Sequence, residues 1–133
     1  MGATNFPGGV NAAPTNSVTD VSKTASATLT DAECISGGTI VVTGDGGEII
    51  TIPNAASGNI GANVTVVNHT KGAVRILPHS SDFIKWGGAL TVAKYVENTA
   101  ATAKKGDYIT LMRNEAATGW YVTAVSGIWA KQA

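Results

Sequence analysis

The sequence predicts a small all-β protein, built as a β-sandwich, a jelly roll or a small tulip-like barrel with an extended N-terminal arm. Its 133 residues are enough for one domain. Valine and isoleucine together number 23 against 4 leucines, and they are accompanied by 17 threonines and 16 glycines, a composition that favours strands and turns over helices. Short apolar runs recur between turn residues, which is typical of sandwiches and small barrels.

Two segments differ in composition. Residues 1–24 predict an extended arm, because Pro7, Pro14 and repeated Asn, Thr and Ala interrupt any hydrophobic period. A terminus without fixed structure is the alternative for this segment. Stretched out, such an arm reaches roughly 70–80 Å at about 3.3 Å per residue, far beyond its own domain. Residues 25–133 predict a single β domain.

The β domain is expected to consist of short strands joined by turns. The strongest hairpin signal is the glycine turn at residues 44–47 between two β-branched runs. A second hairpin is expected around the turn at 69–72, and a last one around 115–119, with its final strand extended to Trp129. The predicted strands cover residues 27–30, 39–43, 48–52, 63–68, 73–77, 82–85, 90–96, 107–113 and 120–125.

Charge excludes several classes of partner. Charged residues make up 14% of the chain and cancel to a formal net charge of zero. A nucleic-acid-binding protein carries a basic footprint, which this composition lacks. Apolar runs are too short to span a membrane, and the first ten residues do not predict a secretory signal. We therefore expect neither nucleic acid nor membrane as a partner.

Catalytic and metal-binding patterns are also missing. His69 and His79 are expected well apart, with no further ligands at a metal-binding spacing, although copies of one histidine meeting on a threefold axis remain an alternative. No nucleophile elbow occurs, and the glycine-rich residues 43–48 lack the Lys-Ser/Thr of a phosphate-binding loop. The lone Cys34 is expected to be a small buried residue. We expect no enzyme, no cofactor and no metal.

Aromatic residues and uncharged strands point instead to contacts with other proteins. Trp86, Trp120 and Trp129 could form a sugar-stacking platform, but in a chain with 6% aromatic residues they are more often core or interface residues. Trp86 and Trp129 are the predicted contacts between copies. The runs 48–52 and 124–129 carry almost no charge, whereas monomers use charge to protect sheet edges. The sequence therefore predicts self-association or docking on a larger surface.

Residues 51–123 resemble a module found in virion proteins of tailed bacteriophages. Its pieces occur here in order, and the opening MGATNFPGGV (1–10) resembles the start of small phage head proteins. The matching pieces are TIPNAA (51–56), VTVVN (64–68), VRILP (74–78), DFI (82–84), the glycine pair 87–88, GDYITL (106–111) and GWYV (119–122).

The resemblance covers two uses of the module, capsid decoration (cement) proteins and tail-fibre or spike segments that bind host surface glycans. Both typically form homotrimers. The short chain, without repeats or a coiled-coil stem, and the N-terminal arm favour decoration. The resemblance then implies a protein made in the bacterial cytoplasm and bound to the outer surface of the virion capsid, with the major capsid protein and further copies of itself as partners. The expected capsid-binding arm residues are Asn5, Phe6, Pro7, Val10 and Pro14.

Overall fold

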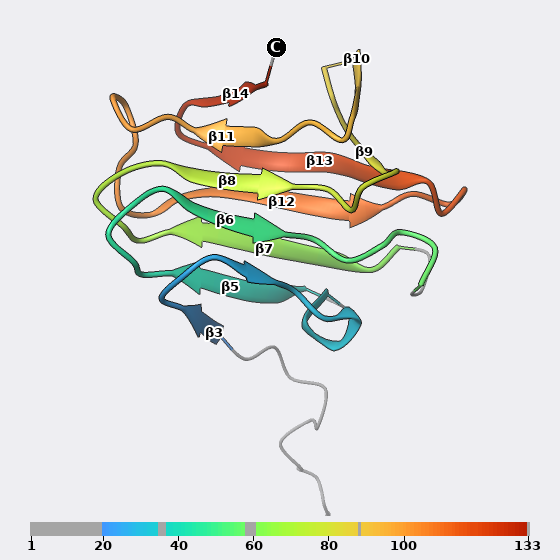
Figure 1. The fold of residues 1–133 in the computed structure, drawn as a ribbon, viewed down its shortest axis with the longest axis horizontal. Helices are drawn as coiled ribbons and strands as arrows, with labels where there is room; N and C mark the ends of the chain where they lie inside the picture. The colour runs from blue at the N-terminus through green and yellow to red at the C-terminus, as the bar shows by residue number, and fades with distance from the viewer. Residues whose placement is uncertain (1–19, 35–36, 58–60, 88, 133) are drawn as a thin grey trace, which may run out of the picture.

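The computed structural model describes residues 20–34, 37–57, 61–87 and 89–132, which form two sheets (Figure 1). The larger sheet contains β3 (Asp20–Lys23), β5 (Gly38–Val42), β7 (Asn63–Asn68), β9 (Phe83–Trp86), β10 (Ala89–Val92), β12 (Asp107–Arg113) and β13 (Gly119–Ser126). The smaller sheet contains β4 (Ala27–Thr28), β6 (Glu48–Thr51), β8 (Val74–Leu77), β11 (Val96–Asn98) and β14 (Trp129–Lys131). The 3₁₀ helix η1 (Asp31–Cys34) lies between β4 and β5.

The two sheets pack against each other as a sandwich, which confirms the predicted all-β class. The seven-stranded order is β10-β9-β13-β12-β7-β5-β3, and the five-stranded order is β14-β11-β8-β6-β4. Half of the pairings between described strands are parallel, which differs from the antiparallel order of a jelly roll. Among the described residues, the sheets end in separate edge strands, β10 and β3 in one and β14 and β4 in the other, and are not joined into a barrel.

The first part of the chain winds between the sheets as a flattened coil. β3, β5 and β7 lie parallel in the seven-stranded sheet, while β4, β6 and β8 lie parallel in the five-stranded sheet. Each pass of the chain therefore adds one strand to each sheet. Side chains alternate strictly along β7 between buried and partly exposed, as expected for strands with one face on a core.

The hairpins predicted at residues 39–52 and 63–77 are wrong. β5 and β6 belong to different sheets, as do β7 and β8, so each turn carries the chain across the sandwich. The glycines serve the stacking of these turns: Gly46 has a φ of 110°, and a Cβ on it would lie 2.9 Å from the Cα of Gly72 in the next pass. Backbones that approach this closely require glycine.

The second part of the chain is mostly antiparallel and covers the coil. The predicted hairpin of β12 and β13 is confirmed, with a bulge where the register shifts between Thr110 and Leu111. β12 pairs with β7, and β11 pairs with β8, so the last turn of the coil is covered in both sheets. The strand expected at 90–96 is broken at Ala93, which has a φ of 53° and separates β10 from β11.

The final strand crosses to the other sheet. Gly127, with a φ of 91°, ends β13, and β14 then pairs with β11. The predicted continuation of the last hairpin strand to Trp129 is therefore wrong. A Cβ on Gly127 would overlap the carboxylate of Asp107, so this crossing also depends on glycine.

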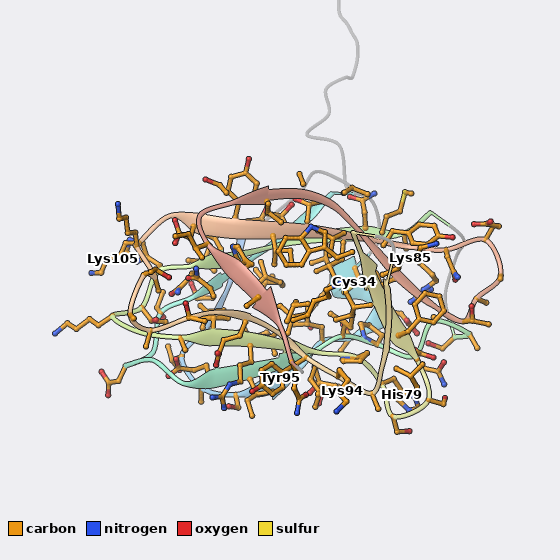
Figure 2. The ribbon with its side chains drawn as sticks, turned by 90° about the horizontal axis from the view of Figure 1, so that it is seen from above. Cys34, His79, Lys85, Lys94, Tyr95 and Lys105 are labelled. Atoms are coloured by element: carbon orange, nitrogen blue, oxygen red, sulfur yellow. The ribbon has the colours of Figure 1, made fainter. Side chains whose placement is uncertain are left out.

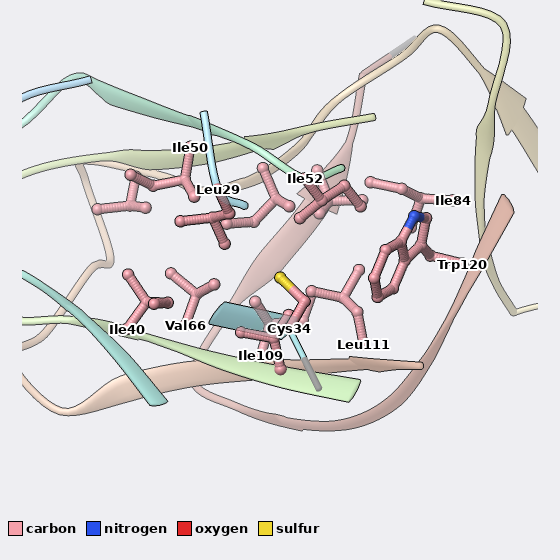
Figure 3. Packing of buried hydrophobic residues seen from close by; sticks show 14 of the residues in the cluster. Leu29, Cys34, Ile40, Ile50, Ile52, Val66, Ile84, Ile109, Leu111 and Trp120 are labelled. Atoms are coloured by element: carbon pink, nitrogen blue, oxygen red, sulfur yellow. The ribbon is translucent and has the colours of Figure 1, made fainter. Parts of the chain in front are cut away.

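Hydrophobic side chains from both sheets fill the space between them (Figure 3). Trp120 is the largest fully buried side chain, and Cys34 lies within the same cluster. The fully buried members of the cluster are Cys34, Ile40, Val42, Ile50, Ile52, Ala55, Val64, Val66, Val74, Ile76, Ile84, Val96, Ile109, Leu111 and Trp120. Among the described residues no helix is long and apolar enough to cross a membrane.

The predicted boundary between arm and domain falls within the sheet. Residues 20–23, expected in the arm, form β3 at the edge of the seven-stranded sheet, where Val21 packs against the core. The β domain therefore begins at or before residue 20. The arm residues Asn5, Phe6, Pro7, Val10 and Pro14 lie outside the described residues.

Candidate functional site

The residues with catalytic or metal-binding chemistry do not gather. His69 lies in the exposed turn between β7 and β8. His79 lies just after β8, at the opposite end of that strand, and is on the side of Lys85 in Figure 2. The described residues contain no group of three His, Cys, Asp or Glu side chains that could hold a metal ion. Burial raises the pKa of the Cys34 thiol to about 12, so the group that would act as a nucleophile, the thiolate, is strongly disfavoured.

A buried polar group at one end of β12 is the amide cluster, defined as Asn68, Asn98 and Asp107. Asn68 Nδ2 donates to Asn98 Oδ1 at 2.5 Å, and Asn98 Nδ2 donates to Asp107 Oδ2 at 3.1 Å and to the carbonyl of Ile128 at 3.0 Å. These contacts join β7 and β12 of one sheet to β11 of the other. The amide and carboxylate groups are occupied by one another and by the backbone, so the cluster holds the sheets together.

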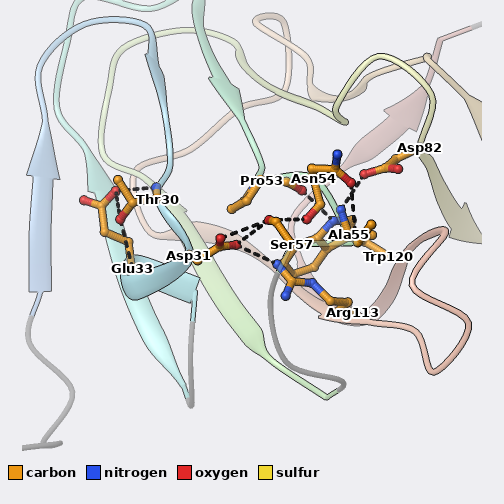
Figure 4. A network of polar contacts seen from close by, with 11 residues as sticks. Thr30, Asp31, Glu33, Pro53, Asn54, Ala55, Ser57, Asp82, Arg113 and Trp120 are labelled. Carbon is orange, nitrogen blue, oxygen red and sulfur yellow. Dashed lines mark hydrogen bonds and ion pairs between the residues drawn. The ribbon is translucent and has the colours of Figure 1, made fainter.

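At the other end of β12 lies the arginine cluster, defined as Arg113, Asp31 and Ser57 (Figure 4). Only 1% of the Arg113 side chain is exposed, and its guanidinium donates from Nη2 to Asp31 Oδ1 at 3.1 Å. Asp31 also accepts a hydrogen bond from the Ser57 hydroxyl at 3.0 Å. Nε and Nη1 of Arg113 have no hydrogen-bond partner among the described residues. The guanidinium carbon lies over the Trp120 ring, 4.9 Å from the ring centre.

This buried arginine was not among the sequence-based candidates. The signal that could have found it is register: residues 107, 109, 111 and 113 all face inward along β12. Arg113 therefore has to enter the core beside Trp120, its cross-strand partner on β13. The arginine cluster connects η1 and the segment after β6 to β12, so its contacts stabilise the fold.

The three tryptophans are used differently. Trp120 is fully buried and donates its indole N–H to the carbonyl of Pro53 at 3.2 Å, so it offers no platform for a sugar. Trp129 is 6% exposed and donates to the carbonyl of Ser126 at 3.0 Å. Trp86 is partly buried against the core and borders a shallow depression with residues 122–125. Of the two predicted contacts between copies, Trp86 is thus the one with a substantial exposed surface.

The outer side of the seven-stranded sheet is its most distinctive surface. We call the outward side chains of its four adjacent strands β5, β7, β12 and β13 the uncharged face, because they include no charged residue; the exposed Lys85 of β9, beside Tyr121, borders this face. Thr65 and Thr110 share a hydrogen bond of 2.8 Å across neighbouring strands, which uses polar groups that would otherwise bind water. The residues of this face are Thr39, Val41, Asn63, Thr65, Val67, Tyr108, Thr110, Met112, Tyr121 and Ala124.

The outer side of the five-stranded sheet contrasts with it. Arg75 and Glu97 form an ion pair of 2.5 Å between β8 and β11, and the Arg75 guanidinium lies 5.0 Å from the centre of the Tyr95 ring. The Glu97 bond and charge raise the pKa of Arg75. Charged side chains on a sheet face disfavour its burial against another protein, because their desolvation is costly. The uncharged face is the better docking surface.

Comparisons with known proteins give no independent assignment. No protein-family model matches the chain, and no curated protein matches its sequence.

Proposed function

We propose that this chain is a bacteriophage head decoration protein that binds the outer capsid surface as a trimer and stabilises the expanded shell. The virion-module resemblance suggests the setting, and the uncharged face is the observation that favours docking on another protein. A sheet face of Thr, Val, Tyr and Met loses little hydration energy when it is covered, whereas charged groups would lose much.

The mechanism is stabilisation by mass action. A protein that binds the expanded shell and not its precursor or dissociated subunits lowers the free energy of the expanded state. Three linked copies add avidity, because the second and third contacts form at a high effective concentration. No catalytic step is needed.

Copy number in purified virions tests this proposal. We expect about one copy per major capsid subunit, or a simple fraction of that ratio, measured by quantitative mass spectrometry. A trace ratio would instead assign the chain to the tail, and its absence from virions would contradict any virion role.

A pair of matched variants tests the docking face. Val67→Glu places a charge on the uncharged face, while Ile49→Glu places the same charge on the outer side of the five-stranded sheet. We expect Val67→Glu to lose binding to expanded heads lacking the protein, and Ile49→Glu to retain it. Equal binding by both variants would contradict the assignment of this face.

A tail-fibre or spike module that binds a host surface glycan is the second candidate. The depression beside Trp86 favours it, because a partly exposed indole can stack on a sugar ring. This function predicts quenching of tryptophan fluorescence by host surface glycan, with the response lost in Trp86→Ala. Unchanged fluorescence over a full glycan titration would contradict it.

A further inference from the structure

Strand β13 of the seven-stranded sheet pairs with a described neighbour along only part of one edge. β9 pairs with residues 119–121 of β13, in the register Gly119↔Phe83 to Tyr121↔Lys85, and no strand that the structure describes continues along residues 122–126 on that side. The bulge explains the separation. Thr110 pairs with Ala124 and Leu111 with Val122, so Thr123 is the extra residue, and a bulge bends and twists its strand.

This free edge is well suited to pair with another strand. Alternate backbone groups of an extended strand point away from its existing partner and need a hydrogen-bonding neighbour. Residues 123–126 are all exposed, and 37% of Val125 is accessible. The Ser126 carbonyl is already taken by the Trp129 indole, so the available edge lies chiefly at 122–125.

The edge itself carries no charge, although two lysines lie nearby: Lys85 on β9 is opposite Tyr121, and Lys131 Nζ donates to the carbonyl of Trp86 at 2.9 Å. The stretch 116–130 has no charged residue, and the depression between Trp86 and residues 122–125 has a volume of about 240 Å³. Exposed edges of monomers are generally protected by charges, prolines or covering segments. An added strand could place alternate side chains into this depression while its backbone pairs with β13.

We propose that residues 15–19 of a second copy occupy this edge as an added strand. The segment Thr15-Asn16-Ser17-Val18-Thr19 is uncharged, rich in strand-favouring residues, and lies between Pro14 and the first charged residue, Asp20. Five extended residues span about 17 Å, the same length as residues 122–126. Pro14 sets the start of the strand, since proline lacks the backbone N–H.

Chain geometry excludes the segment of the same copy. Residue 19 is bonded to residue 20 at the start of β3, and β5, β7 and β12 separate β3 from β13. An added strand beyond β13 would lie about 24 Å from β3, at roughly 4.8 Å per strand position. A strand covering 15–19 with its end fixed at β3 therefore cannot lie along its own β13.

The contact would be head to tail. The donor segment and the receiving edge are different parts of one copy, so such contacts form a ring when the rotation between copies closes. Three copies would give the proposed trimer, and residues 1–14 would stay available for the capsid. The inference rests on the proposed self-association and not on capsid binding.

Disulfide cross-linking between two single variants tests the contact directly. The variants Ser17→Cys and Ala124→Cys are prepared separately, and one carries a tag that changes its mass. The two are mixed, incubated so that subunits exchange between oligomers, and then oxidised. The buried Cys34, whose pKa is raised to about 12, contributes little background. We expect a mixed disulfide-linked dimer, and none when Ala130→Cys, also on an exposed strand position, replaces Ala124→Cys. An equal yield from both mixtures, or no cross-link with Ala124→Cys, would overturn the inference.

Sedimentation of point variants gives a second test. Ala124→Lys on the receiving edge and Val18→Asp in the donor segment are expected to shift the oligomer to monomers, while Ala130→Lys and Val10→Asp leave it intact. Far-UV circular dichroism and the Tm of each variant show whether the protomer stays folded. A monomeric wild type, or an oligomer that survives both edge variants, would overturn the inference. Failure to bind heads with the oligomer intact would contradict the proposed function alone.

Discussion

Buried polar side chains lie at both ends of β12, and the two clusters differ in how completely they are bonded. In the amide cluster, the donors and acceptors of Asn68 and Asn98 are used within the protein. In the arginine cluster, two nitrogen atoms of Arg113 have no partner among the described residues, and 45% of the Asp31 side chain is exposed. A buried polar group contributes to stability only when it is bonded, so the amide cluster should contribute more.

The largest effect is expected from Asn98→Ala. It removes two donated hydrogen bonds and one accepted bond, and leaves Asp107 and the carbonyl of Ile128 short of a donor. We expect the free energy of unfolding to fall by about 3–4 kcal/mol, measured by urea denaturation. Thr102→Ala, on an exposed turn, is the control and should cost less than about 0.5 kcal/mol. Similar losses of unfolding free energy in Asn98→Ala and Thr102→Ala would contradict a special contribution of the amide cluster.

Gly127→Ala affects the same end of β12, where Asp107 lies, by straining the backbone. Gly127 has a φ of 91°, and its new Cβ would overlap the Asp107 carboxylate. We expect a loss of about 2–3 kcal/mol, whereas Gly87→Ala, with a φ of 67° and open space around its Cβ, should lose about 1 kcal/mol. Thermal denaturation of the two variants measures the difference, and a larger loss in Gly87→Ala would contradict it.

Arg113→Met should change stability little. It replaces a buried guanidinium that is incompletely bonded by an apolar side chain of similar length, and the exposed Asp31 can be hydrated. Such replacements are often neutral or stabilising, so we expect a change within about 1 kcal/mol by urea denaturation. A loss as large as that of Asn98→Ala would show that the arginine cluster matters as much as the amide cluster.

The smallest effect is expected for the pH dependence of stability that comes from Glu33 in η1. Burial opposes ionisation of Glu33, but hydrogen bonds and charge from Lys23 and Thr30 outweigh it and lower the pKa of this carboxyl below 4.5. Since the folded pKa is lowered, this stabilisation is present above the unfolded value and is lost as the pH falls through the folded one. Glu33→Gln should therefore reduce the decline in Tm between neutral pH and pH 3, and an unchanged decline would contradict this.

The sequence predicted the strands better than their pairing. Alternation placed residues 63–68 and 107–113 as strands with the observed bounds, because one face of each packs on the core. The turn glycines at 44–47 were also recognised, but a tight turn does not determine whether the next strand returns in the same sheet or crosses to the other. In the structure the turn at 44–47 packs closely on Gly72, in the following pass of the chain, and a contact between residues so far apart in the sequence is not visible in a local pattern.

The candidate surfaces were predicted in part. Low charge at 124–129 pointed to an unprotected edge, and among the described strands none pairs with residues 122–126 of β13 on the side of β9. Trp129 was expected on a surface, but the crossing at Gly127 places its indole in the core. The two Arg113 nitrogens that have no partner among the described residues depend on which segments fold over β12, and no local pattern reveals that.

The coiled first part of the chain also bears on how proteins of this design could change in length. The first pass advances the two sheets by 19 and 23 residues, from Val21 to Ile40 and from Ala27 to Ile50. In the second pass Ile40 pairs with Val66 and Ile50 pairs with Ile76, so both sheets advance by 26 residues. A tandem duplication of that unit would insert one strand into each sheet, and the inward and outward positions of all later residues would be kept. Genes for such chains could lengthen by whole units without passing through a misregistered core, whereas the antiparallel part offers no equivalent unit.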